Sequence, residues 1–296
     1  MLQMDKTTEK RHTPDYTSKQ HFIPQFLLKN FTIEKVKKGH LYEYKKTTSE
    51  IRKRHINQVA YAPHLYSIEA DSERDDRLEK AFSKVETEAA PIIEKIIAKR
   101  SLTGLKDEEI QYLAEFLISL YSRSAYAVNF VNQHAPDELE NIENRLKQEF
   151  PAKATEIEKV IARKKIKGAF YTDTFPASHE HSFKYITKYM EMALYTTPKG
   201  CRFVLSDRYA LLCSKPAINL TPGNTQIENI HAIYCPISSD LCIVFREKKT
   251  PDNDLHWRNE LQSLTELQLA QVNNLAVKSC NQYIYCEDED SLKKVI

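Results

Sequence analysis

The chain has 296 residues, of which 41% are hydrophobic and 28% are charged. That length suffices for one large domain or two smaller ones, and it excludes a minimal peptide-like module. With 43 Lys and Arg against 41 Asp and Glu, the net charge is only +2. No overall field would therefore attract nucleic acid or an anionic membrane, and such contacts would need a local patch.

Two further features bear on where the protein works. No stretch approaches the roughly 20 apolar residues of a membrane span, and the opening MLQMDKTTEK lacks the apolar run of a signal peptide. The six cysteines lie in the last third of the chain without a CxxC pair, at Cys201, Cys213, Cys235, Cys242, Cys280 and Cys286. A disulfide set and a zinc site are the alternatives, but we expect free thiols and a cytoplasmic protein with no membrane partner.

The first ordered element is expected after a polar lead of residues 1–19, which has no periodic apolar face and should be flexible. From Phe22 to Phe31 the apolar positions fit a short helix, in which Pro24 is tolerated only in the first turn. His21 would then lie at the helix entrance. Residues 40–56, HLYEYKKTTSEIRKRHI, alternate with period two on each side of a Thr-Thr-Ser turn, which predicts a β-hairpin.

Four helices are expected in the middle of the chain, over about residues 75–197, because only 5 residues of the chain are glycine and apolar stripes recur at helical spacing. Their expected positions are from about Asp75, from Asp107 to about Asn132, from Asp137 toward Lys167 with a break near Pro151, and over residues 179–195. The third is polar all round, so it should lie on the surface or project as an arm.

After Gly200 the pattern changes to short apolar runs, RFVLS, YALLCS, IHAIYCPI and DLCIVFRE, which predict antiparallel strands over about residues 200–250. A last helix is expected over about residues 263–283. Because the N-terminal hairpin needs a sheet partner, we predict an α+β fold. A helix-rich middle would pack with an antiparallel sheet built from the N-terminal hairpin and the C-terminal strands, in one interwoven domain of residues 20–296.

The segment HFIPQFLLKNF, His21–Phe31, resembles the opening motif of a bacterial family called domain of unknown function 4238 (DUF4238). Shorter resemblances follow at Val59-Ala60, Leu65-Tyr66, Leu78–Ala90, Ser206-Asp207, Pro236-Ile237-Ser238 and Asn273-Asn274. The family commonly continues its Ser-Asp element with Asn-Pro, where this chain has Arg208-Tyr209. The resemblance covers most of the chain and implies a common fold, but it supplies no mechanism.

Three residues in these motifs have side chains suited to catalysis. His21 could titrate near neutrality or ligate a metal, or else fix the preceding chain by hydrogen bonding. Glu86, on the same helix flank as Glu79, could act as a general acid or base, or else form an ion pair. Asp207 follows a strand and could join the site or stabilise a turn. If they converge, they would form an acid/base centre or a Mg²⁺ or Mn²⁺ site, with Glu79, Glu86 and Asp207 as the metal ligands.

Basic residues could hold the substrate. Lys29 lies about two turns beyond His21, and the run Arg52, Lys53 and Arg54 is interleaved with tyrosines that could stack bases. A solvated surface is the alternative role for both. The sequence contains no GxxxxGK[ST], GxGxxG, HExxH or GxSxG motif.

We therefore expect a metal-dependent or acid/base hydrolase that acts on nucleic acid or a nucleotide, with a nuclease of a bacterial toxin or phage-defence type as its sharpest form. The alternative is a non-catalytic binding module, in which the polar arm of residues 137–167 contacts a protein partner or a second copy of the chain.

Overall fold

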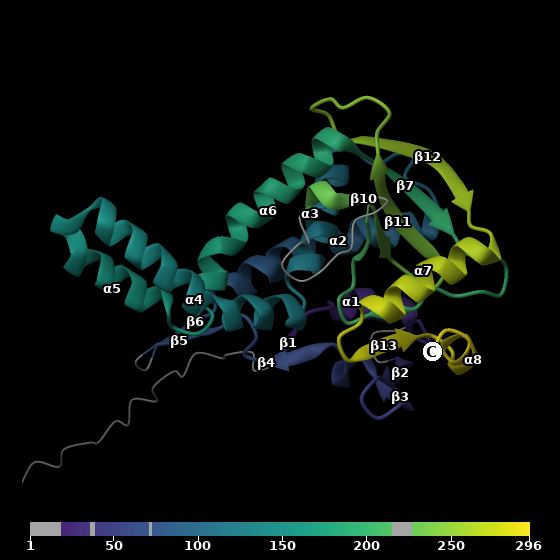
Figure 1. The fold of residues 1–296 in the computed structure, drawn as a ribbon. Coiled ribbons are helices and arrows are strands. Elements are labelled where there is room, and N and C mark those ends of the chain that lie inside the picture. The colour runs from purple at the N-terminus through teal and green to yellow at the C-terminus, as the bar shows by residue number, and fades with distance from the viewer. Residues whose placement is uncertain (1–18, 36–38, 71–72, 215–226) are drawn as a thin grey trace, which may run out of the picture.

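The computed structural model describes residues 19–35, 39–70, 73–214 and 227–296 (Figure 1). The predicted flexible lead lies outside these ranges apart from Lys19. The helices are α1 (Gln25–Leu28), α2 (Arg77–Lys99), α3 (Asp107–Ser122), α4 (Ala125–Glu149), α5 (Ala154–Lys164), α6 (Ala169–Tyr189), α7 (Glu266–Ser279) and α8 (Glu289–Lys293). None of these helices, within the described ranges, is both long and apolar enough to cross a membrane.

A five-stranded sheet lies at the centre of the fold, with strand order β12-β7-β11-β10-β9. Its members are β7 (Met190–Thr196), β9 (Leu211–Ser214), β10 (Ile230–Pro236), β11 (Leu241–Glu247) and β12 (His256–Ser263). The apolar run of β11 is buried on both faces over its first five residues, as expected for an inner strand. Neighbours pair antiparallel, except for the parallel pair β12 and β7.

The N-terminal hairpin belongs to a second, four-stranded sheet with order β3-β2-β13-β8. It consists of β2 (His40–Lys45), β3 (Glu50–His55), β8 (Leu205–Ser206) and β13 (Tyr283–Cys286), all paired antiparallel. The hairpin thus joins C-terminal strands, as predicted, and the α+β fold is confirmed. The remaining predicted strands lie in the five-stranded sheet, together with β7 and β12, which were not predicted, so the predicted strands are divided between two sheets.

The opening motif differs from its prediction. His21 ends a strand, β1 (Lys19–His21), which pairs with β4 (Tyr61–Pro63), so it does not lie at a helix entrance. Pro24 occupies the N-cap of α1, whose single turn continues as a 3₁₀ helix over Lys29–Phe31. The strand pairing of β1 accounts for the shorter helix, because it holds the first residues of the motif extended. A further short ribbon follows, β5 (Ile68–Ala70) with β6 (Glu73–Asp75).

Several predicted helix boundaries were wrong: α4 begins at Ala125 instead of Asp137, and α6 begins at Ala169 instead of residue 179. The helix predicted from Asp107 to Asn132 breaks at Ser124, whose hydroxyl accepts a hydrogen bond from the amide of Ala127 and caps α4. α4 then continues through Pro136, which removes only one backbone donor. The helix predicted over 179–195 ends at Tyr189, because the next seven residues form β7 between β11 and β12.

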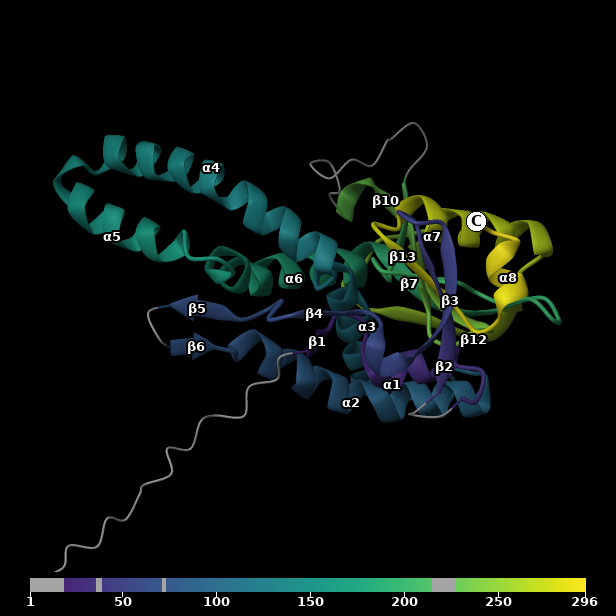
Figure 2. The same ribbon diagram turned by 90° about the horizontal axis from the view of Figure 1, so that it is seen from below.

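One large hydrophobic core includes buried residues from Phe22 to Leu292. A second, small cluster of Ala135, Leu139 and Ile161 lies between α4 and α5. These two helices include most of the predicted 137–167 arm, and they extend together away from both sheets (Figures 1 and 2). The single interwoven domain stays a prediction.

The cap at Ser124 yields a stability prediction. Ser124→Ala should lower the free energy of unfolding by about 1 kcal/mol, because an amide at the start of α4 loses its partner. Ser83→Ala is the matched control, since Ser83 is exposed inside α2, where alanine is the better helix former. Urea denaturation of both variants measures the difference. Equal stability of Ser124→Ala and the control would contradict the assignment.

Candidate functional site

The guanidinium of Arg123 gathers two of the predicted site residues. Its side chain is 2% exposed, and its Nη2 lies 2.7 Å from the backbone oxygen of His21 and 2.7 Å from Oε1 of Glu86. The guanidinium also lies 4.4 Å from the ring centre of Phe82, a cation–π distance, and the Tyr66 hydroxyl donates to the backbone oxygen of Arg123. His21 and Glu86 therefore meet at one buried cation.

These contacts define what His21 and Glu86 do in the fold. Glu86 neutralises Arg123. Burial raises the pKa of the Tyr66 hydroxyl, and the charge of Glu79, in the same helix as Glu86, adds to this effect. Burial, assisted by Lys19 and Arg123, lowers the pKa of His21 to about 4, so its ring is neutral at pH 7. The ring lies 5.6 Å from that of Tyr61 and contacts the Gln25 amide at 3.3 Å.

Asp207 stabilises a turn. Its carboxylate accepts hydrogen bonds from the backbone amides of Asn281, Gln282 and Tyr283 at 2.8, 2.7 and 3.0 Å. Burial raises the pKa of Asp207, although these three bonds oppose the shift. The carboxylate thus fixes the start of β13 beside the N-terminal hairpin, and it lies in a cleft that neither His21 nor Glu86 lines.

This cleft, which we call the sheet cleft, has a volume of about 490 Å³. It lies between the four-stranded sheet, β4 and the start of α4. Its lining residues are Phe22, Glu43, Arg54, Gln58, Val59, Ala60, Tyr61, Ala62, Pro63, Ala125, Asn129, Asp207, Asn281, Gln282, Tyr283 and Tyr285. Most of its polar groups are amides and tyrosines, and its charged residues are Asp207 and one further pair of opposite charges.

That pair is Glu43 and Arg54, which project from the same face of the sheet. Glu43 lies opposite Arg52 in the ladder, and Arg54 lies two residues further along β3. Burial raises the pKa of Glu43, and the neighbouring Arg54 and Arg52 only partly offset the effect. Within the described part of the chain, Arg54 makes no hydrogen bond or ion pair, and its Nε is buried. The cleft therefore combines an unpaired cation with a desolvated carboxyl.

The other predicted binding residues are separated from this pair. Arg52 is exposed and bonded to Glu50 at 2.5 Å, while Lys53 projects from the opposite face of the sheet. Lys29 forms an ion pair with Glu94 of α2. Only Arg54 of the four lines the sheet cleft. Period-two alternation puts Lys53 on the opposite face, and Arg52, on the same face as Arg54, is turned to Glu50 instead.

Comparison with known proteins gives one assignment. A family model described as "Protein of unknown function (DUF4238)" matches residues 19–290. The chain belongs to this family. Neither the curated proteins nor the solved structures gave a match. Segments that resemble DUF4238 motifs, far apart in the sequence, meet at the sheet cleft: Phe22, Val59-Ala60 and Asp207 all line it.

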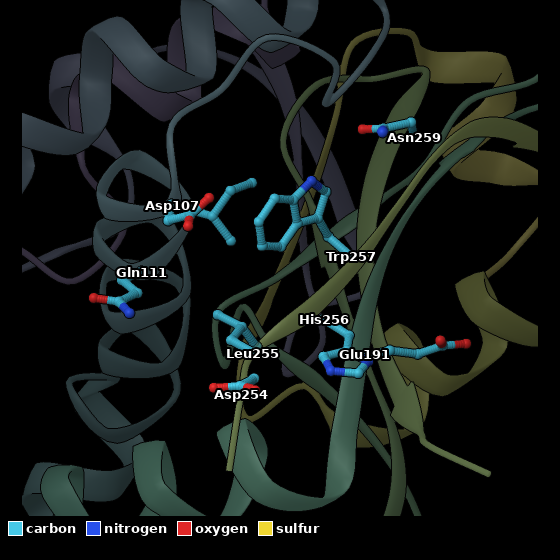
Figure 3. A pocket seen from close by; sticks show the side chains of 9 residues that line it. Asp107, Gln111, Glu191, Asp254, Leu255, His256, Trp257 and Asn259 are labelled. Atoms are coloured by element: carbon cyan, nitrogen blue, oxygen red, sulfur yellow. The ribbon is translucent and has the colours of Figure 1, made fainter. Parts of the chain in front are cut away.

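A second pocket, of about 550 Å³, lies between the start of α3 and β12 (Figure 3). Asp107, Ile110, Gln111, Glu191, Asp254, Leu255, His256, Trp257 and Asn259 line it. Nothing in the resemblance to DUF4238 pointed to these residues. The strand that supplies several of them, β12, was also missed from the sequence, since most of its side chains are exposed and show no apolar alternation.

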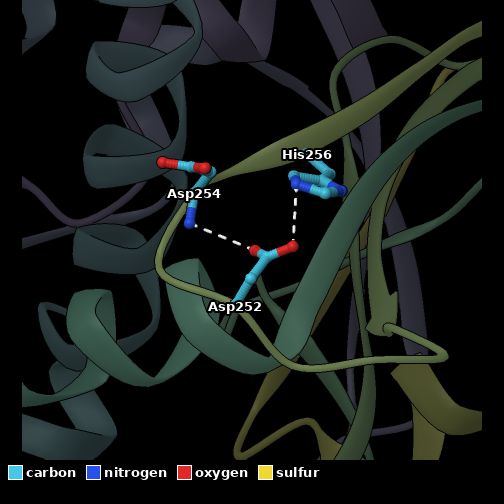
Figure 4. Close-up of side chains that lie close together, drawn as sticks. All are labelled: Asp252, Asp254 and His256. Atoms are coloured by element: carbon cyan, nitrogen blue, oxygen red, sulfur yellow. Dashed lines mark hydrogen bonds and ion pairs between the residues drawn. The ribbon is translucent and has the colours of Figure 1, made fainter.

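Beside this pocket, Asp252, Asp254 and His256 place one ligand atom each within 4.8 Å of one another, the only such group of three in the described ranges (Figure 4). The predicted ligands Glu79, Glu86 and Asp207 form no such group. The ammonium of Lys248, with 3% of its side chain exposed, already bonds Asp252 Oδ1 and the backbone oxygens of Thr187 and Asp254. The buried ammonium of Lys248 thus holds this turn together.

Glu43 is the residue of the sheet cleft that the sequence analysis missed. The alternation in HLYEYK places it on the same face as Leu41, a buried residue, and this was the available signal. The signal could not show that Arg54 and Asp207 would share the cleft.

The pKa of His21 gives a pH-dependent prediction. The folded chain keeps the ring neutral down to about pH 4, whereas the ring of the unfolded chain gains a proton below pH 6.5. The unfolded state then binds more protons, so the free energy of unfolding should rise between pH 4 and pH 6.5. In His21→Gln this rise should be smaller, as measured by urea denaturation at pH 4.5 and 7. A variant with the wild-type pH dependence would contradict it.

Proposed function

We propose that this protein is an acid/base hydrolase. Its substrate would be a phosphate ester, either a nucleotide or a nucleic acid, bound in the sheet cleft. The observation behind this proposal is the pair of Glu43 and Arg54 on one sheet face, in a cleft where DUF4238 motif segments meet. A carboxyl with a raised pKa beside an unpaired cation in a concave site is typical of catalytic centres.

Each group in the cleft has a distinct task in such a reaction. The Arg54 guanidinium offers planar donors that match two phosphate oxygens. Glu43, with its raised pKa, exchanges a proton with the attacking water or with the leaving oxygen. The rings of Tyr61 and Tyr283 provide faces on which a base stacks, and the Asn129 amide of α4 also lines the cleft.

The residues first expected to be catalytic support this centre from outside. Asp207 holds the 281–283 turn, which supplies part of the wall, and His21 contacts Tyr61 from the neighbouring strand. In this scheme His21 and Asp207 are positioning residues, and Glu86 keeps Arg123 in place. The proposed proton transfers use these side chains alone. The assay tests Mg²⁺ and Mn²⁺ in separate reactions.

A second candidate function rests on the α4–α5 arm. Phe150 and Val160 are each 50% exposed on it, and a contact with a partner would bury this apolar surface. They favour a contact with a protein partner or a second copy of the chain. A cytoplasmic enzyme with such an arm would also fit a toxin or phage-defence role, which we include in the proposal.

The test compares purified wild type with Glu43→Gln and Arg54→Gln on RNA, DNA and nucleotides, with and without Mg²⁺ or Mn²⁺. Glu43→Gln should lower the rate by about 10²–10⁴-fold, because the proton donor or acceptor is lost. Arg54→Gln should chiefly weaken substrate binding, by about tenfold or more, because one charge-assisted hydrogen bond is lost. Because burial raises the pKa of Glu43 above its usual 4.5, the rate of the wild type should change with pH in a range above 4.5.

Lys53→Gln is the matched control, since it removes the same charge from the opposite sheet face. His21→Ala should lower activity less than Glu43→Gln. No turnover by the wild type in any condition, or equal loss in Lys53→Gln and Arg54→Gln, would reject the proposal.

A further inference from the structure

The second pocket differs from the sheet cleft in its chemistry. Its volume of about 550 Å³ falls in the range of small-ligand sites. Three carboxylates, of Asp107, Glu191 and Asp254, line it, and no Lys or Arg does. Its apolar floor consists of the buried Ile110 and Leu255.

The three carboxylates are not equivalent. Glu191 bonds Arg246 and Arg258, each at 2.9 Å, so its charge is already neutralised. Asp107, in the first turn of α3, and Asp254, before β12, make no side-chain hydrogen bond or ion pair with any residue that the structure describes. Two carboxylates without a side-chain partner thus line one pocket, Asp107 on the α3 wall, where the helix N-terminus favours its charge, and Asp254 on the β12 wall.

Between these walls lies an aromatic ring. Trp257 is the only tryptophan of the chain, is partly buried, and in Figure 3 its indole points from β12 toward the first turn of α3, where Asp107 lies. The face of an indole attracts cations, more strongly than the face of phenylalanine or tyrosine. The ring and the two carboxylates therefore favour the same sign of ligand charge.

A metal ion fits this pocket less well than an organic cation. Asp254 is the only carboxylate that the pocket shares with the Asp252, Asp254 and His256 group, and Lys248 already holds Asp252 there. A ligand that spans the two walls needs positive charge at both ends and an apolar centre to cross the indole and Leu255. We propose that the second pocket binds an aliphatic diamine or polyamine.

Trp257 makes the test direct, because all tryptophan fluorescence of the protein comes from this pocket. The full chain is titrated with 1,4-diaminobutane and with spermidine at low salt, and 1,4-butanediol serves as the uncharged probe of equal length. We expect a saturable change with both amines, none with the diol, and weaker binding at higher salt. Calorimetry of the same titrations detects binding that leaves the fluorescence unchanged.

The variant Asp107→Asn/Asp254→Asn should bind the amines roughly tenfold more weakly, since it loses two partly exposed ion pairs. Glu108→Gln, which is exposed beside Asp107 in the first turn of α3 but does not line the pocket, is the control and should bind as the wild type does. Circular dichroism establishes that the variants are folded. No saturable signal by either method, an equal response to the diol, or unchanged affinity of the double variant would overturn the proposal.

Discussion

The buried guanidinium of Arg123 is the interaction on which the arrangement of the N-terminal half depends. Removing such a charge from water is costly, and the cost is offset only if every partner is in place. Its partners are the backbone of His21, the carboxylate of Glu86 and the ring of Phe82. Strand β1 is thereby held against α2, and β1 in turn positions β4, whose Tyr61 forms a wall of the sheet cleft.

Three polar residues of the DUF4238 motifs bond to backbone groups of distant segments. Asn30 donates to the Ile237 oxygen at 3.0 Å, joining two motifs, and Asn273 binds both Val204 and Arg202. Asp207 does the same for the start of β13. Because buried backbone groups must find partners, such residues specify how segments meet. These motif residues therefore help to fix the fold, and this is consistent with a resemblance that predicted architecture without chemistry.

Local sequence patterns correctly predicted those elements in which tertiary packing favours the same secondary structure as the intrinsic propensity of the residues. The hairpin, α2 and α7 were all found from the spacing of apolar residues. The segment MEMALYT contains residues that favour helices, yet it forms β7, because pairing with β11 and β12 outweighs propensity. The meeting of His21 with Glu86 depended on Arg123, 102 residues from His21 in the chain, and no local pattern signals such a contact.

The net charge of +2 conceals two pockets with different charged linings: the sheet cleft has one cation with two carboxylates, and the second pocket has three carboxylates and no Lys or Arg. Alternation along β3 puts Arg54 into the sheet cleft, while the turn before β12 and the first turn of α3 put Asp254 and Asp107 into the second pocket. Charges at such exposed sites act over about 8 Å at physiological salt. Each pocket is thus governed by the few side chains that face it, and the overall charge balance constrains neither ligand. The near-zero net charge excludes long-range attraction of a charged ligand by the whole molecule. Ligand recognition therefore depends on which side chains strand register places in each pocket.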